Sequence, residues 1–260
     1  MRGNAVARWW QKDGSTEGEY EDAYAVGAPG RDDTWQLTDG RLRVAVADGA
    51  TESMLSGRWA RSLVRTYVDA QRMQLRGCVF RAVSGWPQSL QDYTHGREQA
   101  GRPISWYEEP GLERGAHATL LVAEFCSEPG DRTGTWLAEA VGDSCLFQVS
   151  GGVLTAAFPL TASVEFGSSP ALVHTGLRKR RVLDRHRSTR AGTWTSGDTF
   201  FLCTDALAEW FLSQHESAAA PWLTWRDLPG PAEFRDWVAD ERQAGRLKND
   251  DVTLVTVVFD

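Results

Sequence analysis

Hydrophobic and polar residues alternate along much of this chain in short runs that predict β-strands. The clearest run is GRLRVAVAD, residues 40–48, which alternates at first and then becomes continuously apolar, as expected for a strand inside a sheet. A first strand is predicted at ARWWQ, residues 7–11. The later pattern indicates an antiparallel meander, with strands at 116–125, 135–143, 144–149 and 153–158. After a loop-rich stretch, further strands are expected at 181–186, 198–205 and 250–259.

Other segments repeat their apolar residues with the period of a helix. Residues 56–73 place Trp59, Leu63 and Tyr67 on one face and arginines on the other. The remaining helical segments are a proline-interrupted stretch from 79 to 114 that ends in a turn at 108–115, a helix at 206–214, and a helix that begins at Pro231 and ends near Gly245. Because the helices are grouped apart from the runs of strands, the pattern predicts an α+β layered sandwich.

Composition and charge narrow the classes of function. The chain has 260 residues, of which 42% are hydrophobic and 24% charged, and we expect a single domain spanning 1–260. The net charge of -7 argues against a nucleic-acid partner, because domains that bind the phosphate backbone of nucleic acids are usually basic. With no run near the roughly 18 apolar residues of a membrane span and no signal-like start, we expect no membrane partner and a cytoplasmic location. The cysteines and histidines lack zinc-site spacings.

Carboxylates stand at the ends of several predicted strands. Asp48, Asp143 and Asp205 each close an apolar run, and further acidic residues flank other strands: Glu21, Asp22, Asp250 and Asp251. Taken singly, such an aspartate is more often a cap or turn residue. Packed together without a cation, these groups would repel one another and have raised pKa values, so the set favours hard divalent cations such as Mg²⁺ or Mn²⁺.

The same segments, in this order, resemble a known family. EDAYAV, VAVADGA, GAHATLLVA, AVGDSCLF, FFLCTDAL and DDVTLVTVV are similar to the metal-dependent serine/threonine protein phosphatases of the protein phosphatase 2C type, in a compact bacterial form. The resemblance covers nearly the full chain. It implies a four-layer αββα sandwich, in which two antiparallel β-sheets are flanked by helices, and a binuclear metal centre at one edge.

The resemblance also implies roles for single residues. Asp48 bridges the two metals, and the carbonyl oxygen of Gly49 binds one of them. Asp205 and Asp250 hold the other metal, so that Asp48, Asp205 and Asp250 form the catalytic set.

Three further acidic residues complete the implied metal site. Glu21 and Asp22 match a pair that binds metal directly or through metal-bound water, and Asp143 matches the position of a third, looser metal. Asp251 stands where the family often has asparagine. The implied cofactors are two Mn²⁺ or Mg²⁺ ions, with room for a third.

The implied activity is hydrolysis of phosphoserine and phosphothreonine in proteins. A metal-bridging hydroxide attacks phosphorus in line while the ions neutralise the phosphoryl oxygens. The implied partner is a phosphorylated protein, either a kinase or a target of one, in bacterial signalling.

One departure from the family leaves alternatives open. Active members carry a phosphate-binding arginine four residues before the Glu-Asp pair, and this chain has Glu17 there. We expect Arg58 to replace it, with Lys12 and Arg8 as other candidates. The alternatives to a protein phosphatase are a binding or regulatory domain that keeps the metal site with little turnover, and a small-molecule phosphohydrolase.

A basic stretch interrupts the acidic chain. It includes Arg178, Lys179, Arg180 and Arg181. It is either a solvated face or a docking site for a phosphorylated or acidic partner segment.

Overall fold

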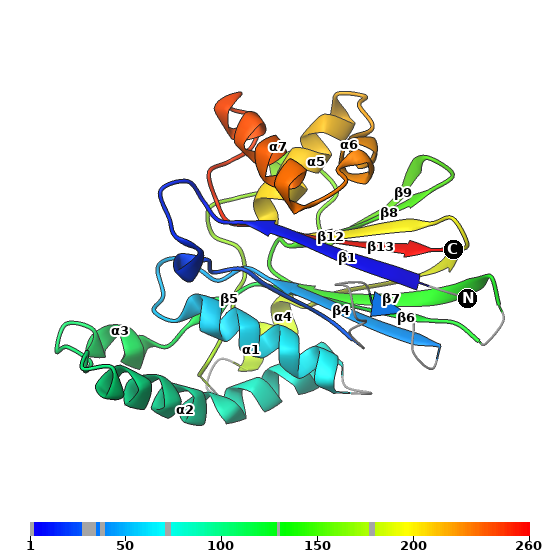
Figure 1. Cartoon of the computed structure of the whole chain (residues 1–260). Helices are drawn as coiled ribbons and strands as arrows, with labels where there is room; N and C mark the ends of the chain where they lie inside the picture. Colours follow the sequence, from blue (N-terminus) through cyan, green and yellow to red (C-terminus); the bar gives the residue numbers. More distant parts are fainter. Residues whose placement is uncertain (1–2, 28–34, 37–39, 71–73, 129–130, 177–179) are drawn as a thin grey trace.

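The computed structural model describes residues 3–27, 35–36, 40–70, 74–128, 131–176 and 180–260. Two antiparallel sheets pack face to face, and helices cover both outer faces (Figure 1). The α+β class and the four-layer αββα sandwich predicted from the sequence are confirmed. Among the described residues, no helix is long and apolar enough to cross a membrane.

Each of the two large sheets combines at least one pair of consecutive strands with strands from distant parts of the sequence. The six-stranded sheet has the order β3 (Trp35–Gln36), β1 (Gly3–Trp10), β13 (Val252–Phe259), β12 (Thr199–Cys203), β8 (Cys145–Ser150) and β9 (Val153–Phe158). The five-stranded sheet has the order β11 (Ser188–Thr195), β7 (Thr133–Val141), β6 (Leu120–Cys126), β4 (Arg41–Ala47) and β2 (Ala23–Val26). A small sheet pairs β5 (His117–Ala118) with β10 (Val173–His174).

The helices form the two outer layers. The five-stranded sheet is covered by α1 (Ser56–Asp69) and α2 (Leu75–Gln99), with α3 (Glu109–Arg114) beyond them. The six-stranded sheet is covered by α5 (Asp205–Glu216), α6 (Pro221–Asp227) and α7 (Pro231–Gln243) (Figure 1). Short helices occur at η1 (Glu17–Glu19), η2 (Ser163–Glu165) and α4 (Arg180–His186).

The apolar run of β4 is explained by burial on both of its faces. Val44 and Val46 contribute to the core between the two sheets, together with residues such as Phe200 of β12. Ala45 and Ala47 point the other way, into the core under α1 and α2. Since successive side chains of a strand point to opposite faces, a strand with a core on each side must be apolar throughout.

Three predictions about local structure are wrong. The predicted meander is two hairpins in different sheets, because the chain crosses from β7 to β8 through Gly142, whose φ of 103° is left-handed. Residues 181–186 belong to α4 rather than a strand, and α3 occupies much of the predicted turn at 108–115. Strand β11 was not predicted, because among its residues only Trp194 is buried and the sequence carries little apolar alternation.

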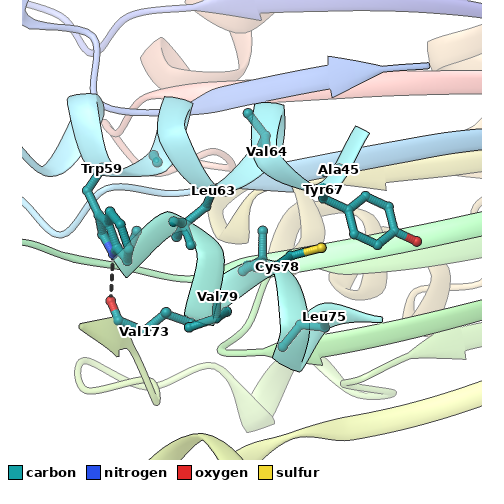
Figure 2. Close-up of a cluster of buried hydrophobic side chains, with 14 of the residues drawn as sticks. Ala45, Trp59, Leu63, Val64, Tyr67, Leu75, Cys78, Val79 and Val173 are labelled. Atoms are coloured by element: carbon teal, nitrogen blue, oxygen red, sulfur yellow. Dashed lines mark hydrogen bonds between the residues drawn. The ribbon is translucent and has the colours of Figure 1, made fainter. Parts of the chain in front are cut away.

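A buried hydrogen bond joins the helical layer to β10. Trp59 of α1 donates through Nε1 to the carbonyl oxygen of Val173 over 2.9 Å, inside the cluster drawn in Figure 2. We expect Trp59→Phe to lower the free energy of unfolding by about 1–3 kcal/mol, because the buried carbonyl loses its donor. Urea denaturation would measure the change. The control is Trp106→Phe, at a side chain that is 80% exposed, and equal losses in both variants would contradict the assignment.

Candidate metal centre

The predicted catalytic aspartates come from both sheets and meet at one edge. Asp48 follows β4 of the five-stranded sheet, whereas Asp205 follows β12 and Asp250 precedes β13 of the six-stranded sheet. Within the six-stranded sheet the register places Asp205 and Asp250 at the same end, since Cys203 pairs with Leu254. Asp48 lies near both, because their charges act on its carboxylate. In Figure 1 this edge lies beside the blue single-turn helix η1.

These carboxylates lie close enough together to affect one another's pKa values. Burial raises the pKa of Asp48 well above its usual range, and the charges of Asp205, Asp250 and Asp143 raise it further. Burial and the neighbouring carboxylates of Asp143 and Asp250 raise the pKa of Asp205 to about 7. Burial raises the pKa of Asp143, in the crossing between β7 and β8, to about 6. The structure thus brings four of the predicted residues into one electrostatic cluster.

Asp22 is the most deeply buried member of this cluster. Its Oδ2 accepts hydrogen bonds from the hydroxyls of Thr204 and Thr253, each over 2.9 Å. These threonines stand at the ends of β12 and β13, so they fix the carboxylate between the two sheets. Burial raises the pKa of Asp22 well above its usual range, followed by the charges of Asp48 and Asp251.

Two carboxylate oxygens of the cluster are buried without a hydrogen-bond donor. These are Oδ1 of Asp22 and Oδ1 of Asp143, for which the described part of the chain offers none. A buried acceptor without a partner is costly, and a bound cation or water would satisfy it. This is the observation that best fits an ion at the site.

Gly49 brings the backbone after Asp48 close to its neighbours. A Cβ at this position would lie 2.7 Å from the carbonyl oxygen of Glu21 and 2.8 Å from the carbonyl carbon of Ser56. Since both contacts are with backbone atoms that cannot easily move, only glycine fits. Thr119 holds the preceding residue, because its hydroxyl accepts from the Asp48 N–H at 3.0 Å.

Glu21 differs from Asp22 and Asp143 because it has contacts with donors on both oxygens. Ser56 donates to Oε1 over 2.5 Å, and the Lys12 ammonium approaches Oε2 at 3.3 Å. The backbone N–H of Glu21 donates to Asp251 over 2.7 Å, and the N–H of Lys12 donates to the other oxygen of Asp251 over 2.8 Å. Asp251 therefore ties the segment before β2 to the start of β13.

Three residues organise this edge although no supporting role was predicted for them. Asp251, Thr204 and Thr253 were missed as supports, although each lies within three residues of a predicted ligand. The sequence signal that could have identified these supports is a hydroxyl or carboxylate side chain close to a strand-end aspartate.

The three candidate cations differ in their contacts. Arg58 turns towards α2, where its guanidinium lies 3.4 Å from the Ser89 carbonyl oxygen and over the Tyr93 ring. Arg8 donates to the carbonyl oxygen of Leu228 over 2.8 Å. Lys12 is the candidate that contacts the acidic edge, through Glu21.

The donor set fits a hard divalent cation that keeps part of its water shell. The residues available are all oxygen donors, which Mg²⁺ and Mn²⁺ prefer. In the part of the chain that the structure describes, no three His, Cys, Asp or Glu side chains form a ready ligand group on their own. Mg²⁺ sites commonly use one or two carboxylates and several waters, so shared and water-mediated contacts are the arrangement that fits.

Comparison with known proteins identifies the family and agrees with the fold. The sequence model of the protein phosphatase 2C family matches residues 21–240. Among curated proteins, no sequence matches the chain. The chain therefore belongs to the protein phosphatase 2C family, which makes it a metal-dependent phosphatase by class.

Solved structures of similar fold include phosphatases that contain metal. The Mycobacterium tuberculosis serine/threonine phosphatase PstP/Ppp has a TM-score of 0.60 at 14% identity, with 100% of both chains covered. The catalytic domain of PstP in complex with two manganese ions has a TM-score of 0.57 at 15% identity, covering 100% of this chain and 99% of that one. RsbX in complex with magnesium has a TM-score of 0.52 at 16% identity, covering 99% of this chain and 95% of that one.

The raised pKa values can be tested by measuring the stability of the protein as a function of pH. Asp205 has a pKa of about 7 in the folded protein, against about 3.9 in an unfolded chain. Folding therefore favours the protonated form, and the stability of the metal-free protein falls as pH rises from about 4 to about 7. With a chelator at pH 8, we expect Asp205→Asn to be more stable than the wild type by about 1–3 kcal/mol in urea denaturation. At pH 5 the difference should shrink, because Asp205 is then neutral in the folded state.

Added Mn²⁺ provides the control for this comparison. It should stabilise the wild type more than Asp205→Asn, because a ligand that binds only the folded state raises its stability. A variant that is less stable than the wild type at pH 8 without metal would contradict the repulsion described for the cluster.

Proposed function

We propose that this chain hydrolyses phosphoserine and phosphothreonine in a protein substrate, with two Mn²⁺ or Mg²⁺ ions held at the strand-end carboxylates. The observation that carries the proposal is the convergence of acidic side chains from both sheets at one edge, with two buried carboxylate oxygens lacking donors. Family membership supports the reaction class, and the ions named for PstP and RsbX support the cofactors.

The proposed ligands divide between the two sheets. Asp48 and the Gly49 carbonyl oxygen would serve from the five-stranded sheet, and Asp205 and Asp250 from the six-stranded sheet. The other members of the proposed set are Glu21, Asp22 and Asp143. When bound, such ions activate a water molecule for in-line attack and neutralise charge on the phosphoryl oxygens.

The residues of this chain hold the site in place. Thr204 and Thr253 fix Asp22 so that its Oδ1 is left for a ligand. Ser56 orients Glu21 through its hydrogen bond to Oε1, and Asp251 holds the backbone on which both Lys12 and Glu21 lie.

Three nucleophilic side chains near the site, Ser53, Ser144 and Cys145, make hydrogen bonds to groups other than the proposed ligand carboxylates. Ser53 donates to the carbonyl oxygen of Ala50, and the Ser144 hydroxyl shares a hydrogen bond with Thr119. The Cys145 thiol donates to the Asp143 carbonyl oxygen, and burial raises its pKa far above the ordinary value. In the described part of the chain, none of these three groups donates a hydrogen bond to a carboxylate or an imidazole, so water is the best-supported nucleophile.

The partner and location stay predictions. A phosphorylated kinase or kinase target in the cytoplasm agrees with the reaction class. Of the basic residues expected to dock a partner, Arg178 and Lys179 lie outside the described residues, whereas Arg180 and Arg181 belong to α4.

Phosphate release tests the proposal directly. We expect the wild type to release phosphate from a phosphothreonine peptide in Mn²⁺, and Asp48→Asn or Asp205→Asn to lower kcat by at least about 100-fold, because each removes a proposed ligand. Asp240→Asn, on the exposed face of α7, should leave the rate unchanged.

The same assay separates the alternatives. Metal binding without release from any peptide would favour the regulatory domain that Glu17 first indicated. Rapid cleavage of p-nitrophenyl phosphate alone would favour a small-molecule hydrolase. Equal release by the wild type and both ligand variants would contradict the proposed centre.

A further inference from the structure

An open cleft of about 520 Å³ adjoins the carboxylate cluster. Glu21 and Ser56 line this cleft and also belong to the acidic edge described above. Arg58 and Arg61 of α1 and Tyr93 of α2 also line the cleft. A segment of another protein lying in this cleft would therefore have one residue next to the proposed reaction centre.

Lys12 presents an ammonium group at the end of the cleft that adjoins the acidic edge. Its Nζ lies 3.3 Å from Glu21 Oε2 and 3.4 Å from the Thr51 hydroxyl, and both contacts are long for hydrogen bonds. About a quarter of the side chain is exposed, since its relative accessibility is 24%. The backbone of Lys12 is fixed by Asp251, so the ammonium is held near the cluster while it keeps donor capacity for an incoming anion.

Arg58 and Arg61 add two positive charges on one face of α1. Residues three apart on a helix are neighbours, and like charges at this spacing repel. Burial, and then the charges of Arg58 and Arg65, lower the pKa of Arg61. In the portion of the chain described, neither Arg58 nor Arg61 forms an ion pair with a carboxylate.

The neutral contacts of the two arginines leave room for a stronger partner. Among the described residues, Arg61 donates to the Tyr20 carbonyl oxygen at 3.4 Å, and Arg58 donates to the Ser89 carbonyl oxygen at the same distance. A carboxylate between the two guanidinium groups would relieve their repulsion and accept charge-assisted hydrogen bonds.

We propose that this cleft receives the phosphorylated segment of the protein substrate, with Lys12 binding the phosphoryl group and Arg58 with Arg61 binding an acidic residue beside the phosphorylated one. The proposal rests on the proposed function, because it takes the carboxylate cluster as the reaction centre. Lys12 would then perform the phosphate-binding role of the family's arginine, because this chain has Glu17 at the arginine's position. It also assigns the enzyme a substrate class, phosphorylated segments with acidic flanks.

Two phosphothreonine peptides, one with acidic and one with neutral flanking residues, test the assignment. Lys12→Met should raise KM for both peptides by about 10- to 100-fold, as expected for the loss of a charged hydrogen bond to phosphate. Lys12→Arg should restore KM, and Mn²⁺ affinity measured by calorimetry should not weaken in Lys12→Met. The double variant Arg58→Met and Arg61→Met should raise KM only for the acidic peptide, by about tenfold.

The matched control is Arg65→Met, an exposed arginine on the same helix that does not line the cleft. Fluorescence anisotropy with the labelled acidic peptide gives a readout that does not depend on turnover, and its Kd should rise in the double variant but not in the control.

Two results would overturn different parts of the account. Wild-type hydrolysis with KM values in the Lys12 and double variants equal to those of Arg65→Met would overturn the cleft assignment and leave the proposed function standing. No hydrolysis of either peptide by the wild type would overturn the proposed function itself.

Discussion

Repulsion among buried carboxylates is the constraint on which the organisation of this protein depends. The acidic groups cannot separate, because each is attached to the end of a strand whose pairing is fixed by a core on one or both sides. Hydroxyl donors from Thr204 and Thr253 satisfy part of the charge at Asp22. Burial, followed by the charges of neighbouring carboxylates, raises the pKa values of Asp48 and Asp205, and burial raises the pKa of Asp143. A divalent cation bound among these carboxylates would offset the unfavourable free energy of burying them together, and this would favour its binding.

The same charge distribution explains why the edge is suited to phosphate chemistry. Phosphate would be repelled by the bare carboxylates, so it can approach only when bound cations offset them or when basic groups lie beside them. The fold supplies such groups on one side, with Lys12 at the edge and the arginines of α1 along the adjoining cleft. Asp251 links the two regions, because it holds the backbone of both Lys12 and Glu21 at the start of β13.

The fold class and the acidic edge were predictable from local pattern, whereas features set by tertiary contacts were not. The apolar run of β4 marked a strand with a core on each face, and Asp48 at its end marked the rim. The crossing from β7 to β8 was missed, because two successive hairpins have the same local pattern whether or not they share a sheet. Strand β11 was missed because pairing with β7, rather than burial of its own side chains, makes it a strand. The position of Lys12 was open because it depends on how residues 11–20 fold back, which Asp251 decides from the far end of the sequence.

A crystal structure grown with Mn²⁺, with anomalous scattering measured at the manganese edge, tests the central claim most directly. We expect at least two anomalous peaks at the sheet edge, within coordination distance of Asp48 and of one or both of Asp205 and Asp250, with waters completing each shell. The unpaired oxygen of Asp22 should lie towards this density or towards a water bound to it. Manganese peaks only elsewhere, or none at saturating Mn²⁺, would contradict the account.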